Sequence, residues 1–570
     1  MGCATSFFKV VSCKATIPLD RQSTPQNSNG ALEHVRSRSD DNRFLSKQVH
    51  LDSLDKFGLT DPNGISSISN GSHDGFYEDP DFPAQPSSLF FSPKSISELE
   101  SYTWKRPYQL SKTPQLYVDG TSRRDVLQGS LGDCWLLSTC AAVAKREDLL
   151  HRVISPTQVL FGPEYTGLIR LNMWRFGKWQ TIIIDDRLPQ RNGKYCYSRC
   201  LDENEFWVAL LEKAVAKMHG SYEAIEGGMP IEAMVDLTGG LAERYELSDS
   251  TMHRTLYRYL RRSFASQAFI TCSRKGDWRQ AHKADQNGLV QGHAYTITGL
   301  FRVNEGKCGK CHLIRVRNPW GDQNEWKGKE DFSTLFLYFR VIYRDDEHLG
   351  PWSDNDANWK LLENSTKQSM GFHNKVDGEF WMDFFSDFCH EFEEVSICTL
   401  GPDFDHDGEV DKLISSTTVF GEWIKGQSAG GSRNNLERFA TNPQFRLDIL
   451  EAEKPLEEGS RSENSRYSQL IISLSQEHQR CVDDKKMKLL QIGFCLYGAK
   501  GSSWLNLQHF KQHKDLGTSG PYINYREVFA RFELLPGSYI IIPATFESNI
   551  ESNFMVRVFS GAKFSLSRIK

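Results

Sequence analysis

The 570-residue chain lacks three features, and each absence excludes a class of protein. It has no basic surplus, because 68 lysines and arginines stand against 73 acidic residues, so a nucleic-acid partner is not expected. It has no apolar run near the ~20 residues that cross a bilayer, which leaves only peripheral contact with a membrane. It has no secretory signal, and its 13 scattered cysteines favour a reducing, cytoplasmic compartment over a disulfide framework.

The amino-terminal segment 1–75 has little apolar content. It is rich in Ser, Asn, Asp, Gln and Arg, which cannot offset the entropy of ordering, so a flexible spacer is expected. Its first residues, MGCATS, match an acylation pattern in which Gly2 is the acceptor and Cys3 is available for a second chain. Two acyl chains would anchor the protein stably at a membrane, and an unmodified tail is the alternative.

Two sequence patterns follow this segment, and the length requires several domains. Over residues 76–400 helical runs mix with β-branched strands, which is an α+β layout. CWLLSTCAAVAKREDLLHRVI predicts a long helix, whereas LIRLNMWRFGKWQTIIIDD and AYTITGLFRV predict strands and hairpins. Over 401–570 short strands recur between turn signals, among them FRLDIL, QLIISLS, LLQIGFCLYG, SYIIIPATF and FMVRVFS, and this favours a β-sandwich.

The stretch QGSLGDCWLLS places Cys134 at the start of a helix. The positive end of a helix lowers a thiol pKa and favours the reactive thiolate. Gln128 lies six residues earlier and can donate a hydrogen bond to the oxyanion that forms when a thiolate attacks a carbonyl. Taken alone, however, a cysteine before an apolar helix is more often packed in a core.

Two later motifs supply the partners that a cysteine nucleophile needs, a histidine to hold its proton and a group to orient that histidine. QGHAYTITG puts His293 at a turn that opens a strand, and RVRNPWG puts Asn318 at the end of another strand. Each residue alone is typical of a structural position. The order Cys, His, Asn is that of papain-like proteases, and its presence in three motifs favours a catalytic triad.

The segments QGSLGDCWLLS, GLVQGHAYTITG and RVRNPWGDQNEW resemble the signature segments of calpains, which are intracellular calcium-dependent cysteine proteases. The similarity continues through VDLTGG and DGEFWMDFFSDF into GEWIKGQSAGGSRNN and NYREVFARFELLPGSYIIIPATFE, and it covers residues 77–570. It implies a two-lobed papain-like core, with a first lobe over 76–230 and a second lobe over 231–400. An all-β, C2-like sandwich over 401–570 would follow.

The resemblance implies a calcium-dependent endopeptidase that makes limited cuts in intracellular protein substrates. Cys134 would attack the scissile carbonyl, His293 would shuttle the proton, and Asn318 would orient the imidazole. Gln128 and the Cys134 amide would hold the oxyanion, while Trp320 would block the cleft until calcium moves it. Transglutaminase-like acyl transfer uses Cys and His with an Asp, so Asn318 argues against it.

The resemblance also implies one calcium ion in each lobe, and binding would bring the lobes together. Calcium takes oxygen ligands from carboxylates and carbonyls. The first-lobe set would be the carbonyls of Val118 and Gly120 with the side chains of Asp125 and Glu205. The second-lobe set would be Glu325, Asp354, Asp377 and Glu379 with the carbonyl of Lys375. Without the family, each of these acids would be read as an ordinary surface residue.

The chain departs from the calpain pattern in one loop. Here 22 residues, 329–350, separate EWKG from PWSD and so part Glu325 from Asp354. The segment holds FSTLFLYFRVIY, which is apolar and β-prone, and it is either a real insertion near the cleft or translated sequence that a shorter message would omit. We expect a weakened or absent second-lobe calcium response. A catalytically impaired regulatory or scaffold protein is the alternative to an active protease.

Three further motifs resemble functional sites but can also be explained as ordinary structural segments. No EF-hand domain follows the sandwich, so a small EF-hand subunit is not expected as a partner. DFDHDGEVDKLI, residues 403–414, imitates an EF-hand loop but ends on Ile414 instead of a bidentate acid, which favours an acidic linker over a weak calcium site. The acidic run DILEAEKPLEEGSRSENS corresponds to a calcium- or lipid-contacting loop of the family, or is a solvated loop. CGKCH, with Cys308, Cys311 and His312, imitates haem attachment but is better explained as a hairpin turn.

Overall fold

The computed structural model describes residues 75–570 apart from 275, 278, 280, 282, 306–308, 328–351, 402–414, 452–466, 483–484, 500 and 502–503. Gly2, Cys3, Cys308, the insertion 329–350, the motif 403–414 and most of the acidic run after Asp448 therefore lie outside the described residues. Within the described part of the chain, no helix has both the length and the apolar character needed to span a membrane.

A fully buried helix, α4 (Cys134–Val143), is at the centre of the first part of the fold. An apolar helix of this kind requires cover on every side. The cover comes from α5 (Glu147–Val153), α6 (Trp207–His219), α7 (Pro230–Thr238), the hairpin β2 (Leu168–Arg175) and β3 (Lys178–Asp185), and later strands. The smaller elements are α1 (Pro86–Leu89), α2 (Ile96–Glu100), β1 (Tyr102–Lys105), α3 (Pro107–Leu110), η3 (Arg123–Asp125), β4 (Leu188–Arg191), β5 (Lys194–Tyr195) and η4 (Glu223–Ile225).

The prediction of one long helix after Cys134 was wrong in its length. The helix ends at Val143, and Arg146 takes a non-helical conformation with φ −116° and ψ 82° before a second helix begins. Glu147 and Asp148 occupy the first turn of that second helix, where the positive helix end favours acidic side chains. The predicted hairpin of β2 and β3 is confirmed, with Leu168 paired to Asp185.

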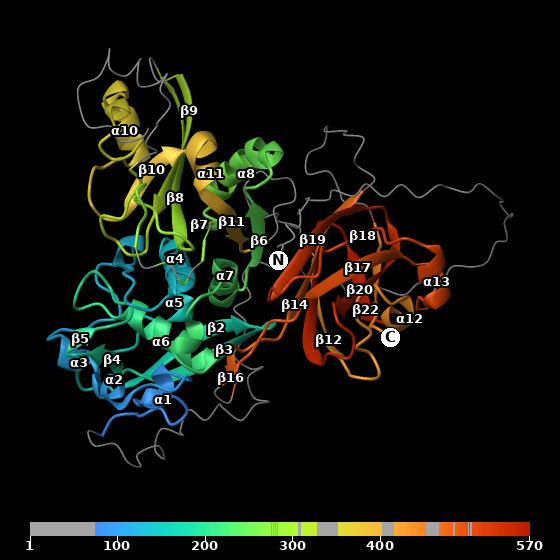
Figure 1. Cartoon of the computed structure of the whole chain (residues 1–570), viewed down its shortest axis with the longest axis horizontal. Helices are drawn as coiled ribbons and strands as arrows, with labels where there is room; N and C mark the ends of the chain where they lie inside the picture. Colours follow the sequence, from blue (N-terminus) through green and yellow to red (C-terminus); the bar gives the residue numbers. More distant parts are fainter. Residues whose placement is uncertain are drawn as a thin grey trace, which may run out of the picture. The chain divides into compact units, whose positions relative to one another are not determined.

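A six-stranded antiparallel sheet forms the second part, in the order β10-β9-β8-β7-β11-β6 (Figure 1). The antiparallel pairing of β8 with β9 brings the beginning of β8 beside the end of β9, as the pair Thr296 and Arg317 shows. His293 and Asn318 flank these two strand ends and therefore lie at the same edge. The elements are β6 (Leu241–Glu246), η5 (Ser250–Met252), α8 (His253–Ala265), β7 (Phe269–Arg274), β8 (Ala294–Glu305), β9 (Gly309–Arg317), η8 (Ala357–Leu361), α10 (Asn364–Met370), β10 (Glu379–Asp383), η9 (Phe384–Phe388), α11 (Cys389–Glu391) and β11 (Phe392–Thr399).

The CGKCH motif has a structural place in this sheet. Cys311 and His312 belong to β9 and pair with Val303 and Arg302 of β8. The two residues are part of a strand ladder, which agrees with the hairpin interpretation.

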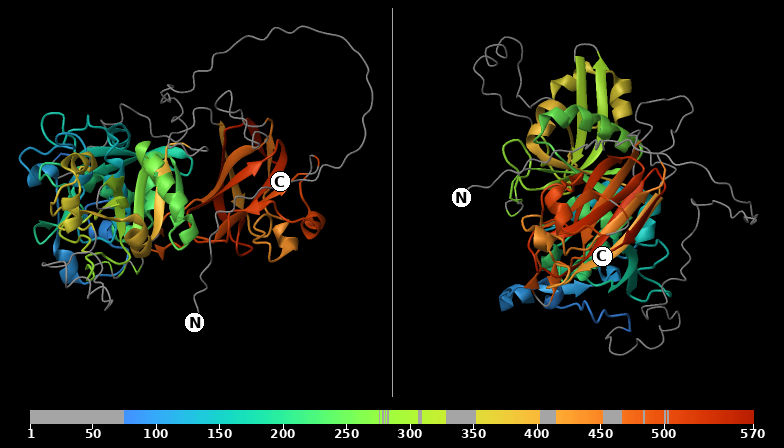
Figure 2. Two further views of the ribbon diagram at one scale, coloured as in Figure 1. Left: turned by 90° about the horizontal axis from the view of Figure 1, so that it is seen from above. Right: turned by 90° about the vertical axis from the view of Figure 1, so that its right-hand side faces the viewer.

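The predicted β-sandwich is confirmed as two antiparallel sheets, drawn in orange and red in Figure 2. Their strand orders are β12-β21-β14-β19 and β18-β17-β20-β13-β22. Their apolar faces meet in one core, and β13 shows the expected alternation of buried and partly exposed residues. The strands are β12 (Ser415–Trp423), β13 (Phe445–Ile449), β14 (Ser468–Gln476), β17 (Ile492–Gly498), β18 (Gly517–Thr518), β19 (Glu527–Leu534), β20 (Gly537–Thr545), β21 (Ser552–Ser560) and β22 (Phe564–Arg568). The remaining elements are α12 (Leu436–Phe439), α13 (Leu507–Gln512) and the ribbon β15 (Cys481–Val482) and β16 (Lys485–Lys486).

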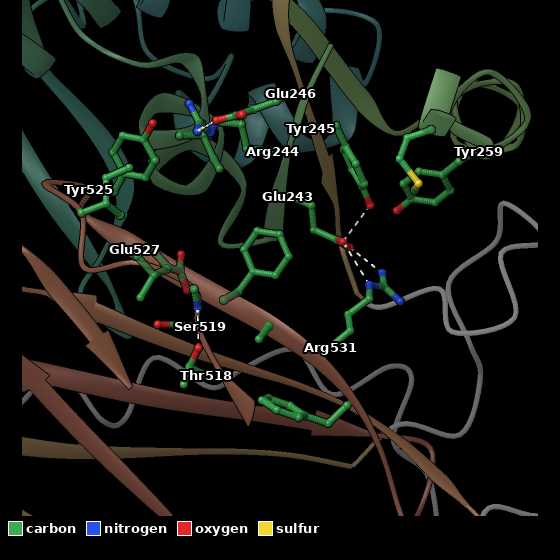
Figure 3. A pocket seen from close by; sticks show the side chains of 18 of the residues that line it. Glu243, Arg244, Tyr245, Glu246, Tyr259, Thr518, Ser519, Tyr525, Glu527 and Arg531 are labelled. Carbon is green, nitrogen blue, oxygen red and sulfur yellow. Dashed lines mark hydrogen bonds and ion pairs between the residues drawn. The ribbon is translucent and has the colours of Figure 1, made fainter. Parts of the chain in front are cut away.

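Arginines near β19 form ion pairs with acids of the protease part. Arg526 donates to both carboxylate oxygens of Asp236 on α7 at 2.8 Å. Arg531 donates to Glu243 of β6 at 2.6 and 3.1 Å (Figure 3). These pairs border a cavity of about 670 Å³ that is lined by residues of β6, α8 and β19.

Candidate active site

Cys134 is the first residue of α4 and is only 7% exposed. Its Sγ accepts a hydrogen bond from the backbone N–H of Ala294 at 3.5 Å, and Ala294 directly follows His293. One turn along the helix, the Ser138 carbonyl accepts from Thr296 Oγ1 at 2.7 Å. The two contacts hold the start of β8 against the start of α4, so the predicted nucleophile and the predicted base come from neighbouring elements.

The imidazole of His293 is fixed by Asn318, with 2.9 Å between Nε2 and Oδ1. An amide oxygen only accepts, so Nε2 carries the hydrogen and Nδ1 is left to take a proton. Asn318 is itself oriented, because its Oδ1 accepts from Trp320 N at 3.1 Å and its Nδ2 donates to the Asn324 carbonyl at 3.2 Å. The Trp320 ring centre lies 5.1 Å from that of His293, so this aromatic covers the imidazole.

Burial controls the protonation states of the pair. It raises the pKa of the Cys134 thiol to about 12, against the opposing hydrogen bond from Ala294, and it lowers the pKa of His293 to about 4. Both shifts favour a neutral thiol beside a neutral imidazole over an ion pair. A neutral imidazole can take the thiol proton as the sulfur attacks a carbonyl.

Two buried acids that the sequence did not single out lie beside the nucleophile. Asp133 directly precedes α4 and is fully buried, and Glu212 of α6 is 1% exposed. Burial first, and then the negative charge of Glu212, raises the pKa of Asp133 well above its usual range. Burial also raises the pKa of Glu212, which accepts from the Ser198 N–H at 3.1 Å. The charge of Asp133 also contributes to the raised pKa of the neighbouring Cys134 thiol, after burial.

Gln128 lies where the segment before α4 meets the loop after β9. Its backbone N–H donates to the Pro319 carbonyl at 3.0 Å, and its Nε2 donates to the Leu131 carbonyl at 2.7 Å. The side-chain amide has two hydrogens, so one remains for another acceptor. The predicted oxyanion donor is therefore next to the loop that carries Asn318.

Arg480 of the sandwich packs against the start of α4. Its guanidinium lies 4.2 Å from the ring centre of Trp135, the residue after Cys134, and it donates to Glu232 of α7 at 2.7 Å. Trp135 is 1% exposed and donates to the Ile225 carbonyl at 2.9 Å. This contact between distant parts of the chain could not be read from the motifs.

The first predicted calcium set is brought together around Glu205. Burial, and then the charge of Asp125, raises the pKa of Glu205 to about 8, and burial raises the pKa of Asp125 to about 6. Glu205 accepts from the Val118 N–H at 3.1 Å. Gly120 has a φ of +89°, a left-handed conformation that favours glycine. A buried acid, Glu205, and a partly buried acid, Asp125, beside an irregular loop fit an oxygen-liganded cation such as calcium.

The second predicted calcium set also converges. Both carboxylate oxygens of Asp354 are buried and have no hydrogen-bond partner among the described residues. Burial, and then the charges of Glu325, Asp377 and Glu379, raises the pKa of Asp354 to about 8. The structure thus brings Glu325 and Asp354 close together although the insertion separates them in the sequence. An unpartnered carboxylate among acids fits a cation ligand.

The other members of this set have partners. Glu325 Oε1 accepts from the Asp377 and Gly378 N–H groups at 3.1 and 2.8 Å, and the Lys375 carbonyl accepts from the Asp377 N–H at 3.1 Å. Glu379 is 2% exposed and differs from the rest. Its carboxylate is paired with a guanidinium of η3, the short helix that precedes α4 in the protease part.

Two arginines of η3 join the segment before α4 to the six-stranded sheet. Arg123 donates to the two oxygens of Glu379 at 2.5 and 3.1 Å, and this hydrogen bonding holds the pKa of Glu379 at about 2 against its burial. Arg124 Nη2 lies 2.8 Å from Nε2 of His373. His373 is not among the predicted site residues. The spacing of His373, Asp377 and Glu379 at the entry to β10 is the sequence feature that could have indicated it. The two acids of this group are separated by one residue.

Metal-free protein is expected to lose stability as the pH rises from about 6.5 to about 8. The pKa values of Glu205 and Asp354 are raised to about 8 and that of Glu325 to about 7, so the folded state holds protons that the unfolded state releases. The free energy of unfolding therefore falls through this window. Thermal unfolding with a chelator should show a lower Tm at the upper pH, and added calcium should raise Tm more there.

The matched variant for this prediction is Glu205→Gln, which removes one of these titrations and should reduce the pH dependence of Tm. A Tm that is constant or rises over the same window in chelator would contradict the raised pKa values.

A helix-start cysteine, a strand-start histidine and a strand-end asparagine form an arrangement of the papain-like cysteine protease type. The family model described as "Calpain family cysteine protease" matches residues 77–334 and 337–399, and that of "Calpain large subunit, domain III" matches 419–559. The chain belongs to the calpain family of cysteine proteases, as the signature segments predict.

Individual relatives agree with the family models. The chain is 38% identical to calpain clp-1 of Caenorhabditis elegans, over 85% of this chain and 58% of that protein. It is 38% identical to Calpain-A of Drosophila melanogaster, over 87% and 56%, and 37% identical to human Calpain-9, over 85% and 65%. The chain thus spans little more than half the length of the first two of these relatives.

Proposed function

We propose that this chain is a calcium-dependent cysteine endopeptidase that makes limited cuts in intracellular proteins. The observation that carries the proposal is the convergence of the three motifs. The Cys134 sulfur accepts from the N–H that follows His293, and the His293 imidazole is held 2.9 Å from Asn318. The family membership supports the same reaction class.

In the proposed reaction Cys134 Sγ attacks the scissile carbonyl carbon while its proton passes to Nδ1 of His293. The negative charge on the carbonyl oxygen is stabilised by the Cys134 N–H and the free N–H of Gln128. His293 then gives its proton to the leaving amine as the C–N bond breaks and a thioester forms. Water, deprotonated by His293, hydrolyses the thioester and restores the thiol.

Asn318 and Trp320 act on His293 in this scheme. The Asn318 oxygen accepts from Nε2 and so keeps Nδ1 available to exchange protons with the sulfur. Trp320 covers the imidazole from one side and keeps water from it. Movement of this ring would also control access to the cleft, which is its role by family resemblance.

The residues present fit calcium in both predicted sites. The first would use Asp125 and Glu205 with the carbonyls of Val118 and Gly120. The second would use Glu325, Asp354, Asp377 and Glu379 with the carbonyl of Lys375. Bound calcium supplies positive charge that compensates carboxylates which otherwise repel one another. The raised pKa values of Glu205 and Asp354 support this assignment.

The remaining parts of the proposal concern place and partners. We infer a cytoplasmic protein whose partners are protein substrates and not nucleic acid. It is built from a spacer 1–75, lobes 76–230 and 231–400, and a sandwich 401–570. Acylation of Gly2 and Cys3, together with the sandwich, would place it at a membrane surface. The MGCATS pattern supports this, and mass spectrometry that finds both residues unmodified would contradict it.

Covalent labelling of Cys134 tests the proposed activity. An epoxide-type thiol inhibitor is expected to modify Cys134, and to do so faster with calcium than with a chelator. The buried, neutral thiol reacts only where His293 can take its proton, so the other buried cysteines should remain unmodified. Peptide mapping by mass spectrometry gives the modified residue. No labelling of Cys134 in either condition would instead favour a regulatory or scaffold protein.

A further inference from the structure

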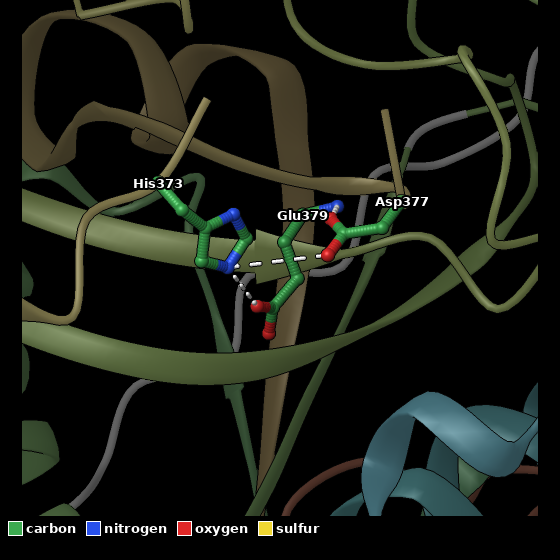
Figure 4. Close-up of side chains that lie close together, drawn as sticks. All are labelled: His373, Asp377 and Glu379. Atoms are coloured by element: carbon green, nitrogen blue, oxygen red, sulfur yellow. Dashed lines mark hydrogen bonds and ion pairs between the residues drawn. The ribbon is translucent and has the colours of Figure 1, made fainter. Parts of the chain in front are cut away.

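One cluster of side chains combines an imidazole with two carboxylates at the entry to β10 (Figure 4). His373 Nε2 lies 3.5 Å from Glu379 Oε2 and 3.9 Å from Asp377 Oδ2. The three ligand atoms all lie within 4.8 Å of one another. In a tetrahedral site with metal–ligand bonds of ~2.0–2.1 Å, neighbouring ligand atoms are about 3.4 Å apart, so only small movements would complete such a site.

A cation already contacts this cluster. Arg124 Nη2 lies 2.8 Å from His373 Nε2, and Arg124 Nε lies 3.6 Å from Asp377 Oδ2. A guanidinium can only donate hydrogen bonds, so His373 Nε2 presents its lone pair to the arginine. That lone pair is also the one that an imidazole gives to a metal ion. Arg124 thus occupies the position from which a metal would draw its nitrogen ligand.

Acidic side chains outnumber guanidiniums around this cluster. Four carboxylates gather here, those of Glu325, Asp354, Asp377 and Glu379, whereas three guanidiniums approach them, those of Arg123, Arg124 and Arg315. Arg123 need not leave, because each oxygen of Glu379 has a second lone pair besides the one that accepts from this arginine. Of these three guanidiniums, Arg124 is the one that contacts the His373 nitrogen and so competes with a metal for it.

We propose that His373, Asp377 and Glu379 form a binding site for a transition-metal ion of the Zn²⁺ class, and that this ion and the Arg124 guanidinium occupy it alternately. The imidazole decides the class of metal, since calcium takes oxygen ligands whereas nitrogen with carboxylate oxygen suits Zn²⁺. Asp377 and Glu379 also belong to the proposed calcium set, so the two metals compete for them.

A metal bound at this site would regulate the proteolytic activity, and this step rests on the proposed protease function. Arg124 belongs to η3, and its contact with His373 joins η3 to the six-stranded sheet that carries His293 and Asn318. Zn²⁺ would replace the contact between Arg124 and His373 with metal–ligand bonds. All of these bonds would be made by residues on the His373 side, and none by η3. The ion would therefore remove one of the contacts between η3 and this sheet, while the Arg123–Glu379 pair remains, and we expect it to lower the rate of hydrolysis.

Binding is tested without activity, in the full chain carrying Cys134→Ala. ZnCl₂ is titrated in calcium-free buffer against a chromophoric chelator, in this background and with His373→Gln, His390→Gln or Arg124→Gln added. His390 is an exposed histidine of α11 outside the cluster and is the matched control. We expect binding to weaken at least ~10-fold in His373→Gln, to stay unchanged in His390→Gln, and to tighten several-fold in Arg124→Gln, where the competitor is gone.

Two results would overturn the site. One is equal Zn²⁺ affinity with and without His373, which would show that His373 is not a ligand. The other is a thiolate-to-cobalt band when CoCl₂ replaces ZnCl₂, which would assign the ion to cysteines. An affinity that Arg124→Gln leaves unchanged or lowers would overturn the exchange with arginine. Circular dichroism checks that His373→Gln is folded, and Arg124→Gln, which keeps all three ligands, tests the site independently. Failure of the parent protein to label at Cys134, together with the expected Zn²⁺ binding in the Cys134→Ala background, would refute the protease and leave the metal site standing.

Discussion

Replacing Cys134 by alanine is expected to lower kcat/KM for peptide hydrolysis by at least ~10⁴-fold, to the level of the uncatalysed background. The reason is chemical, because the acyl group has no other acceptor at this position. The sulfur lies beside the amide that follows His293, which is the residue proposed to take its proton. Initial rates on a fluorogenic peptide at saturating calcium measure the effect.

The matched control is Cys140→Ala, which removes a thiol from the same helix. Cys140 is fully buried on α4 and has its pKa raised by burial, as Cys134 has, but it contacts neither His293 nor Asn318 in any hydrogen bond of the structure. We expect it to keep activity within a few-fold of the parent. Comparable losses in both variants would mean that the effect comes from packing of α4, and would contradict a nucleophilic role for Cys134.

The triad is the part of the site that the sequence predicts best. Its members lie in long motifs, and simple rules place them at element ends, with Cys134 opening α4 and His293 and Asn318 flanking β8 and β9. Antiparallel pairing of these two strands then brings the histidine and the asparagine to one edge. Local patterns fix such positions because turn and strand signals act within a few residues.

Features that depend on distant contacts could not be predicted in this way. The break after Val143 follows from how Glu147 begins a second helix, which a continuous apolar pattern conceals. The contact of Arg480 with Trp135 joins residues 345 positions apart, and the pair of Arg123 with Glu379 joins residues 256 positions apart. Each depends on tertiary packing, which no motif of one segment encodes.

The insertion is the case in which structure changed the expectation most. The sequence suggested that 329–350 could abolish the second-lobe calcium response, because it parts Glu325 from Asp354. In the structure the charge of Glu325 still acts on Asp354, and Asp354 lies among the other acids of the set. The remaining penalty is then the entropy of closing a longer loop, which is small. A weakened response is therefore expected in place of an absent one.

Asp354→Asn is expected to raise the calcium concentration for half-maximal hydrolysis at least ~10-fold, with little change in the rate at saturation. Asparagine keeps the size and one oxygen but removes the charge from the buried carboxylate that has no hydrogen-bond partner among the described residues. Asp322→Asn is the matched control, because Asp322 is a nearby acid outside the proposed set whose charge also acts on Glu325. Equal shifts in the two variants would show a general charge effect and contradict ligation by Asp354.

Deletion of 329–350 completes this test, since it shortens the separation between Glu325 and Asp354 from 29 to 7 positions. Two halvings of a loop lower its closure cost by about 1.2 kcal/mol, which corresponds to about an eight-fold lower calcium requirement. The shift should disappear when Asp354→Asn is added, because the loop then no longer joins two ligands. Equal calcium-stimulated rates with and without the segment would mean that the insertion does not weaken the response at all.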